Sequence, residues 1–304
     1  MKVKKAPASF DTPEEMKSFV LGCEADFETD FRSAVDEMLS SGVPRIIALS
    51  GPTCSGKTTA ANKIISEIEK RGRRINAVSI DDFYYDKDVL HRMSLDSGSG
   101  EIDYDSHKTI DLDTLGAFVD RIFDGGELSC PVFDFHSGRR ISYRKILCGE
   151  NDIFIFEGIQ ALYPQVTALL GKHGFSGAYI APACAVASGA SEFSPNKLRF
   201  LRRLVRDRNF RSTPAEFTFK IWQSVRKNEE ENIFPFADSA HIRIDSSFAY
   251  ELGVLKPYLT RILGELPDNS VYRADADDIL EKLSPVEAIP AELLPEKSLY
   301  REFV

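Results

Sequence analysis

Hydrophobic residues recur at helical spacing close to the start of the chain. Within residues 11–42, one apolar stripe is formed by Phe27, Phe31, Ala34, Val35, Met38 and Leu39. Such spacing is typical of the buried face of a helix. Before the stripe, Asp11-Thr12-Pro13-Glu14 combines a capping side chain, a proline and an acid, which marks a helix start. The pattern predicts an N-terminal helical lead-in over residues 1–42.

Short apolar runs then alternate with helical patterns. Buried strands are predicted at residues 45–50, 76–80 and 152–156, with weaker candidates at 178–181 and 242–244. Helices are predicted at residues 57–71 and 113–123, and a hairpin at 131–136 and 140–145. Fully apolar strands that alternate with helices are typical of a parallel sheet covered on both faces. We therefore expect an α/β fold that binds ligands at the carboxyl ends of its strands.

Composition and charge exclude several classes of protein. The 304 residues are 43% hydrophobic and 28% charged, which allows one large or two modest globular domains. A net charge of −9 argues against a nucleic-acid or anionic-membrane binder. Five widely spaced cysteines without a CxxC pair indicate neither a disulfide framework nor a zinc site. Without a signal peptide or an apolar run of about 20 residues, we expect a cytoplasmic protein.

Residues 51–59 match the phosphate-loop pattern GxxxxGK followed by Ser or Thr. Glycines let the backbone N–H groups turn toward phosphate oxygens, while Lys57 reaches the β- and γ-phosphates and the Thr58 hydroxyl binds Mg²⁺. The chain has no NKxD or LSGGQ-like sequence, which argues against a GTPase and a transporter ATPase. The motif predicts an ATP site formed by Gly51, Pro52, Thr53, Cys54, Ser55, Gly56, Lys57, Thr58 and Thr59.

Acidic residues end two of the predicted strands. Asp81 and Asp82 follow residues 76–80, and Glu157 follows residues 152–156. Both positions would lie at the sheet edge that carries the phosphate loop. Asp81 is therefore a candidate general base and Mg²⁺ ligand, and Glu157 a candidate Mg²⁺ ligand. The structural alternatives are a capping aspartate and a solvated strand end.

A basic helical segment is predicted at residues 196–232. Arg199, Arg202, Arg203 and Arg206 lie near one face of it, because they are three or four residues apart. In an acidic chain, this cluster is a candidate clamp for the phosphoryl group that is transferred. A solvated helix face with salt bridges is the alternative.

The order of these motifs resembles the uridine kinase and phosphoribulokinase family of P-loop kinases over about residues 45–250. The motifs are the loop 51–59, DDFY at 81–84, YD at 104–105, PVFDF at 131–135, FEGI at 156–159 and RRLVRD at 202–207. The resemblance implies a P-loop NTPase-type parallel sheet with helices on both faces and a helical lid at about 196–232. It also implies a kinase domain at 43–250, with a helical or irregular extension at 251–304 packed on it. The segments 232–236 and 250–257 are similar to the bacterial-type nucleoside kinase branch.

The resemblance further implies a reaction and its catalytic residues. The γ-phosphoryl group of ATP would pass to the 5′-hydroxyl of a nucleoside, uridine or cytidine. Asp81 would be the base, with Glu157 near Mg²⁺. Arg202 and Arg206 would be lid arginines.

For the acceptor, the resemblance implies four contacts. Asp105 would hold the ribose hydroxyls, and Arg199 would lie on the substrate side. Phe133 would contact the base, with His136 close by. The family usually has tyrosine where Phe133 stands, and the missing hydroxyl can alter which base is preferred.

Two other functions stay open at this point. A related kinase could use a sugar phosphate, pantothenate or glycerate as acceptor, and a sugar phosphate would need an extra anion site near Asp105 and His136. A nucleotide-binding regulator without catalysis is the second, although Lys57, Asp81 and Glu157 are all present. The terminal extensions are compatible with a homo-oligomer and equally with packing on the kinase domain.

Overall fold

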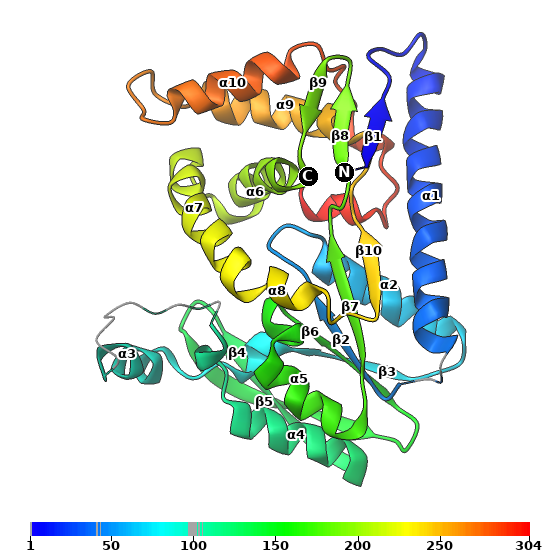
Figure 1. Cartoon of the computed structure of the whole chain (residues 1–304), viewed down its shortest axis with the longest axis vertical. Coiled ribbons are helices and arrows are strands. Elements are labelled where there is room, and N and C mark those ends of the chain that lie inside the picture. Colours follow the sequence, from blue (N-terminus) through cyan, green and yellow to red (C-terminus); the bar gives the residue numbers. More distant parts are fainter. Residues whose placement is uncertain (1, 41, 43, 97–101, 103, 105) are drawn as a thin grey trace.

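The computed structural model describes residues 2–40, 42, 44–96, 102, 104 and 106–304. Its centre is a five-stranded sheet with the strand order β10-β7-β2-β6-β3, in which all neighbours are parallel (Figure 1). The strands are β2 (Ile46–Ser50), β3 (Ile75–Ser79), β6 (Ile153–Glu157), β7 (Ser176–Ala181) and β10 (Ile242–Asp245). All five lie where the hydrophobic runs predicted strands, so this expectation is confirmed.

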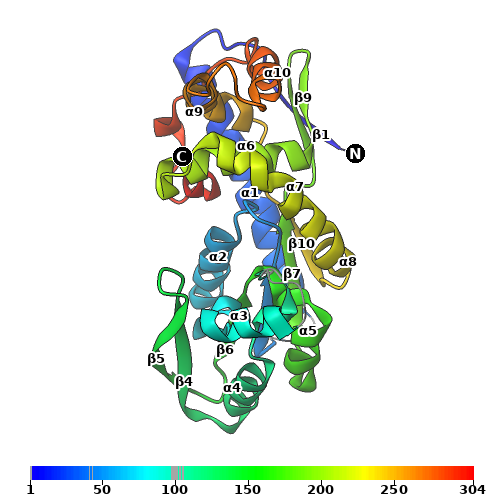
Figure 2. The same ribbon diagram turned by 90° about the vertical axis from the view of Figure 1, so that its left-hand side faces the viewer.

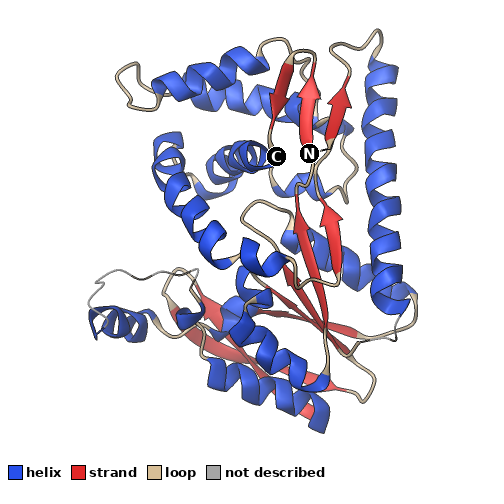
Figure 3. Cartoon of the chain, viewed as in Figure 1, coloured by secondary structure: helices blue, strands red, loops and turns tan. Residues whose placement is uncertain are grey.

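Both faces of the sheet are covered, because the first four residues of β2 and of β6 are all apolar and point alternately to the two faces. In β2, Ile47 and Leu49 enter one apolar cluster, whereas Ile46 and Ala48 enter the other. The first cluster contains residues of α1 (Pro13–Ser40) and α2 (Lys57–Lys70), and the second contains residues of α4 (Leu112–Asp124) and α5 (Pro164–Leu170). The predicted α/β fold with helices on both faces is confirmed, as the colouring of Figure 3 makes visible.

The predicted hairpin is present and is longer than expected. Strands β4 (Gly126–Asp134) and β5 (Arg139–Cys148) form an antiparallel pair beside the main sheet (Figure 2). Its inward residues, Leu128, Cys130 and Phe133, join the second apolar cluster. The hairpin therefore carries Phe133 toward the sheet.

A second, smaller sheet was not expected from the sequence. It contains β1 (Val3–Ala6), β8 (Ala185–Ser188) and β9 (Ser191–Phe193), and β1 pairs with β8 in parallel. Residues 1–42 thus contain a strand before the predicted helix. Two of the four residues of β1 are lysines, so the strand has no apolar pattern of its own and depends on a distant partner.

Helices form most of the remaining chain. They are α3 (Lys87–Asp96), α6 (Pro195–Arg211), α7 (Ala215–Asn232), α8 (Phe234–Ala237), α9 (Glu251–Gly264) and α10 (Arg273–Leu283). The predicted lid at 196–232 corresponds to α6 and α7. Within the described residues, no helix is long and apolar enough to cross a membrane.

The two ends of the chain are joined to each other by buried polar contacts. Glu24 of α1 is buried and accepts hydrogen bonds from the hydroxyls of Tyr250 and Ser298. The last residues, including the 3-10 turn Leu299–Glu302, lie next to α2 in both views (Figures 1 and 2). Residues from α1, α9, α10 and this turn all belong to the first apolar cluster.

Because α1 shares that cluster, we predict that its core residues stabilise the whole chain. Phe31 is 1% exposed, and replacing it with alanine should lower the free energy of unfolding by about 3–4 kcal/mol. Urea denaturation should show one transition. Glu37→Ala, an exposed change on the same helix, should have almost no effect. A separate, early transition for α1 in Phe31→Ala would contradict this prediction.

Candidate active site

The phosphate loop between β2 and α2 has the backbone conformation that an anion cradle needs. Cys54 and Gly56 have positive φ angles of 57° and 91°. Left-handed residues within such a loop turn successive N–H groups toward one point. At Gly51, a Cβ atom would lie 2.1 Å from the carbonyl oxygen of Ile180, so no larger residue fits. The buried Ser55 Oγ has no hydrogen-bond partner among the described residues, which leaves it available to a phosphate.

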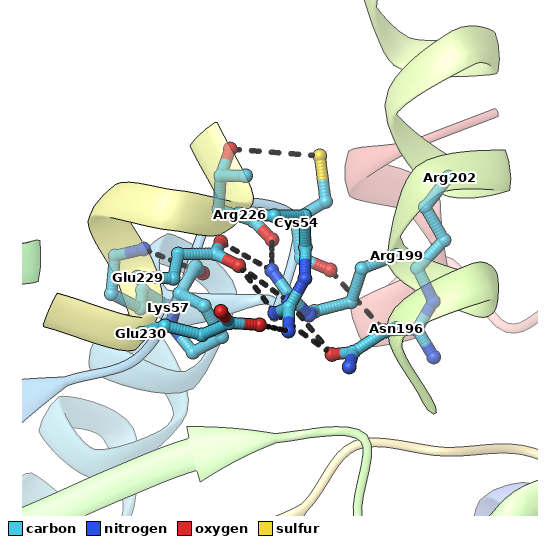
Figure 4. Close-up of polar contacts among 10 residues, drawn as sticks. Cys54, Lys57, Asn196, Arg199, Arg202, Arg226, Glu229 and Glu230 are labelled. Atoms are coloured by element: carbon cyan, nitrogen blue, oxygen red, sulfur yellow. Dashed lines mark hydrogen bonds and ion pairs between the residues drawn. The ribbon is translucent and has the colours of Figure 1, made fainter. Parts of the chain in front are cut away.

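The Lys57 side chain folds back over this loop. Its Nζ donates to the carbonyl oxygen of Pro52 at 3.1 Å (Figure 4). Burial lowers the pKa of Lys57, and the carboxylates of Glu157, Glu302 and Asp81 act in the opposite direction. The ammonium group therefore lies among acidic groups from three distant parts of the chain.

Two of these acids come from the ends of neighbouring strands, as predicted. Glu157 ends β6 and is paired in register with Ser79, the last residue of β3, and Asp81 follows two residues later. Burial, together with the negative charge of Glu157, raises the pKa of Asp81 to about 6. A hydrogen bond from Tyr84 and the charge of Lys57 partly oppose this rise. The structure thus brings Lys57, Asp81 and Glu157 together.

The oxygen atoms at this edge fit a magnesium ion. Thr58 offers a hydroxyl in the first turn of α2, and Asp81 and Glu157 offer carboxylates. Mg²⁺ prefers hard oxygen ligands and usually binds to one or two carboxylates together with substrate phosphates. No group of three or more His, Cys, Asp or Glu suited to a metal occurs in the described part of the chain. The donor set is therefore of the kind that Mg²⁺ shares with a bound nucleotide.

Two of the predicted clamp arginines hold the phosphate loop by its backbone. Arg199 Nη1 donates to the carbonyl oxygen of Thr53 at 3.2 Å, and Arg202 Nη1 donates to that of Cys54 at 3.4 Å. Both side chains are buried. Arg199 pairs with Glu229 of α7 at 2.7 Å, and Arg202 pairs with Glu251 of α9 at 2.9 Å. Figure 4 shows Arg199, Glu229 and Arg226 gathered close to Cys54 of the loop.

This arrangement differs from both interpretations of the arginine spacing, the phosphoryl clamp and the solvated helix face. A solvated helix face is wrong for Arg199 and Arg202, because neither side chain reaches solvent. A free clamp would leave the guanidinium groups unpaired, whereas here each is already neutralised by a buried carboxylate. Their hydrogen bonds instead fix the carbonyl groups of the loop, which keeps the opposite N–H side open for a ligand.

Arg203 and Arg206 share a single acidic partner, Asp207. Arg203 Nε lies 3.1 Å from it and Arg206 Nη2 lies 3.0 Å from it. Although burial lowers the pKa of Arg206, the nearby carboxylates of Asp207 and Glu302 hold it above its ordinary value. Arg206 therefore lies near the loop, and its role as a lid arginine stays a prediction.

The expected acceptor residues are only partly assembled. Phe133 is buried and lies against Tyr84, with 5.7 Å between the ring centroids, and its backbone N–H donates to Asp82 at 3.1 Å. His136 is an exposed turn residue whose backbone N–H donates to Asp134. Asp105 lies outside the described residues. Contacts of these side chains with a nucleoside stay predictions.

Tyr84 and Gln160 were not singled out from the sequence, yet both join the site. Gln160 Nε2 donates to Tyr84 Oη at 2.6 Å, and Tyr84 Oη donates to the carbonyl oxygen of Tyr104 at 3.1 Å. The Tyr84 hydroxyl also lies beside Asp81 and lowers the pKa of that carboxyl. The signal for both was proximity in sequence, because Tyr84 follows DDF and Gln160 follows FEGI. Together they fix the environment of Asp81.

Comparison with known proteins shows a sequence similarity that includes the segment with the phosphate loop. A model of the Phosphoribulokinase / Uridine kinase family matches residues 46–173. Uridine-cytidine kinase C of Dictyostelium discoideum is 26% identical over 133 residues, covering 43% of this chain and 26% of that protein. Inorganic pyrophosphatase TTM1 of Arabidopsis thaliana is 24% identical over 241 residues, covering 78% of this chain and 32% of that protein. Among solved structures, a phosphoribulokinase from Rhodobacter spheroides has 14% identity and a TM-score of 0.43, covering 79% of this chain and 99% of that one.

These matches confirm the family resemblance for the segment that carries the phosphate loop, Asp81 and Glu157. The chain spans about a quarter to a third of the length of the two curated relatives.

We predict that Asp81→Asn stabilises the ligand-free protein. The pKa of about 6 in the fold exceeds the ordinary 3.8, so the charged carboxylate destabilises the fold above pH 6, and this penalty vanishes below pH 3.8. At pH 8 the substitution should raise the free energy of unfolding by about 1–3 kcal/mol. The gain should shrink as the pH falls through 6. Thermal denaturation from pH 8 to pH 4 measures it, with the exposed Asp268→Asn as control. No gain at pH 8 would contradict the prediction.

We also predict that lysine cannot replace Arg202. One ammonium group cannot reach Glu251, the Ser246 carbonyl and the Cys54 carbonyl at once. Arg202→Lys should lower the free energy of unfolding by about 3 kcal/mol, measured by urea denaturation. Arg208→Lys, in an exposed pair with Glu265, should change it by less than about 0.5 kcal/mol. Equal effects of the two variants would show that the loop does not depend on Arg202.

Proposed function

We propose that this chain is an ATP-dependent nucleoside kinase that phosphorylates the 5′-hydroxyl of uridine or cytidine in the cytoplasm, as in pyrimidine salvage. The observation that carries the proposal is the convergence of Lys57, Asp81 and Glu157 at one edge of the sheet. Tyr84 lies beside Asp81 and packs edge-on against Phe133, so the two aromatic side chains adjoin the proposed general base. The similarity to a uridine-cytidine kinase adds support.

The phosphate loop would bind the donor. Its N–H groups and the unpartnered Ser55 hydroxyl would hold phosphate oxygens, and Lys57 would exchange its contact with the Pro52 carbonyl for the β- and γ-phosphates. When bound, Mg²⁺ supplies positive charge that neutralises the phosphate oxygens, and Thr58, Asp81 and Glu157 would hold it. Arg199 and Arg202 would act by keeping the loop in shape.

Asp81 would accept the proton of the attacking hydroxyl. Its pKa of about 6 in the ligand-free protein leaves the carboxylate deprotonated near neutral pH, and a bound cation would keep it so. Tyr84, held in turn by Gln160, would keep the Asp81 carboxylate oriented toward the acceptor. Phe133 would contribute stacking without a hydrogen bond, which favours recognition of a base by shape.

The similarity to a pyrophosphatase supplies a second candidate. That match covers 78% of this chain, against 43% for the uridine-cytidine kinase, and both leave most of the relative unmatched. In this alternative, the substrate would be inorganic pyrophosphate, and a water molecule activated by Asp81 would attack it in place of the nucleoside hydroxyl. Release of phosphate from pyrophosphate in the absence of any acceptor distinguishes the two reactions.

A panel of acceptors tests the proposal. The purified chain with Mg-ATP should convert uridine or cytidine to the monophosphate, detected by mass spectrometry. Lys57→Ala should reduce this rate by about 100-fold or more, because no ammonium group then stabilises the negative charge on the transferred phosphoryl group. Lys70→Ala, at the exposed end of the same helix, is the matched control.

The panel should also contain ribulose 5-phosphate, glycerate, pantothenate and inorganic pyrophosphate. Phosphorylation of one of the first three compounds, with no phosphorylation of nucleosides, would show that the acceptor belongs to another class of compound. Phosphate release from pyrophosphate alone would favour the hydrolase. No nucleoside monophosphate above the Lys57→Ala background would overturn the proposed function.

A further inference from the structure

The last turn of the chain lies directly on the phosphate loop. A Cβ atom on Gly56 would lie 2.5 Å from Leu299 Cδ2, so the leucine side chain rests on this glycine. Next to it, Glu302 Oε2 accepts hydrogen bonds from the Thr59 hydroxyl at 3.0 Å and from the Thr59 backbone N–H at 3.4 Å. A carboxylate from the end of the chain is therefore bound at the start of α2.

The donors that Glu302 uses are suited to a phosphate. Thr59 is the third residue of α2, and N–H groups in the first turn of a helix have no partner within the helix. Together with the helix dipole, such groups form an anion site, and here they adjoin the phosphate loop. Lys57 and Arg206 both experience the charge of Glu302. The carboxylate thus has the surroundings that a nucleotide phosphate would need.

Buried contacts hold the turn in this position. Tyr300 Oη donates to Glu251 at 3.0 Å, and Glu251 pairs with Arg202, which contacts the Cys54 carbonyl. Tyr300 and Phe303 are fully buried. Glu302, in contrast, is only partly buried. The turn is therefore anchored by its neighbours, while the Glu302 side chain can leave without disturbing them.

We propose that Glu302 is an internal competitor of the nucleotide, whose carboxylate occupies the Thr59 donors until a nucleotide phosphate displaces it. Two anions cannot share the same donors without strong repulsion, so binding of one excludes the other. The apparent affinity for nucleotide is then reduced by the fraction of molecules in which Glu302 covers the site. The inference rests on the nucleotide-binding part of the proposed function and not on the identity of the acceptor.

Titration calorimetry on the full chain tests this inference with Mg-ATP and with inorganic tripolyphosphate. Glu302→Gln keeps the size of the side chain and removes its charge, and it should lower the Kd of both ligands by about tenfold. Glu302→Asp keeps the charge on a shorter side chain and should give an intermediate Kd. Glu296→Gln removes a charge from an exposed position in the same segment and should leave the Kd within about twofold of the wild type.

The possible results separate this inference from the proposed function. An unchanged or higher Kd in Glu302→Gln, with nucleotide still bound, would overturn the competition and leave the kinase proposal intact. Equal tightening in Glu302→Gln and Glu296→Gln would attribute the effect to net charge and also overturn it. If neither the wild type nor any variant binds either ligand, the proposed function fails, and the inference fails with it.

Discussion

The carbonyl groups of the phosphate loop determine much of the surrounding structure. A loop that turns its N–H groups toward a phosphate must turn carbonyl groups the other way, and those of Thr53 and Cys54 point toward buried guanidinium groups. A buried carbonyl needs a donor, which Arg199 and Arg202 provide, and a buried arginine needs a carboxylate. Glu229 and Glu251 meet that need from α7 and α9. Helices α6, α7 and α9, which lie outside the sheet, therefore contribute to the phosphate site.

The acidic side of the site depends on a different constraint, the register of the parallel strands. Because β3 and β6 end level with each other, Glu157 and Asp81 must lie close together, which is unfavourable for two carboxylates. Lys57 partly offsets their repulsion. Burial and repulsion together destabilise the ligand-free protein, and a bound cation would remove this destabilisation. The same geometry that destabilises the ligand-free protein thus prepares the site for a metal-bound phosphate.

Features encoded within a few residues could be predicted from the sequence, and those that depend on distant partners could not. The apolar runs gave the five strands, and the glycines and Lys57 gave the loop, because each pattern has a local physical cause. The pairing of β1 with β8 joins residues about 180 positions apart, and nothing in Val3–Ala6 signals it. Likewise, the spacing of the arginines predicted a basic face but did not reveal the carboxylates that pair with the buried arginines. Glu302 carries no motif, since its position follows from the packing of Tyr300 and Phe303.

The buried contacts that hold the phosphate loop in shape also have a consequence for synthesis on the ribosome. The loop emerges from the ribosome well before Arg199 and Arg202, which contact it, and before Glu229, Glu251 and Tyr300, which hold those arginines. Domains usually begin to fold as they leave the ribosome, from the N-terminal side. When residues 51–59 have just been made, neither the two arginines that contact the loop nor the carboxylates that neutralise them exist yet. The phosphate loop therefore cannot be held in this shape until the residues up to Tyr300 have been made.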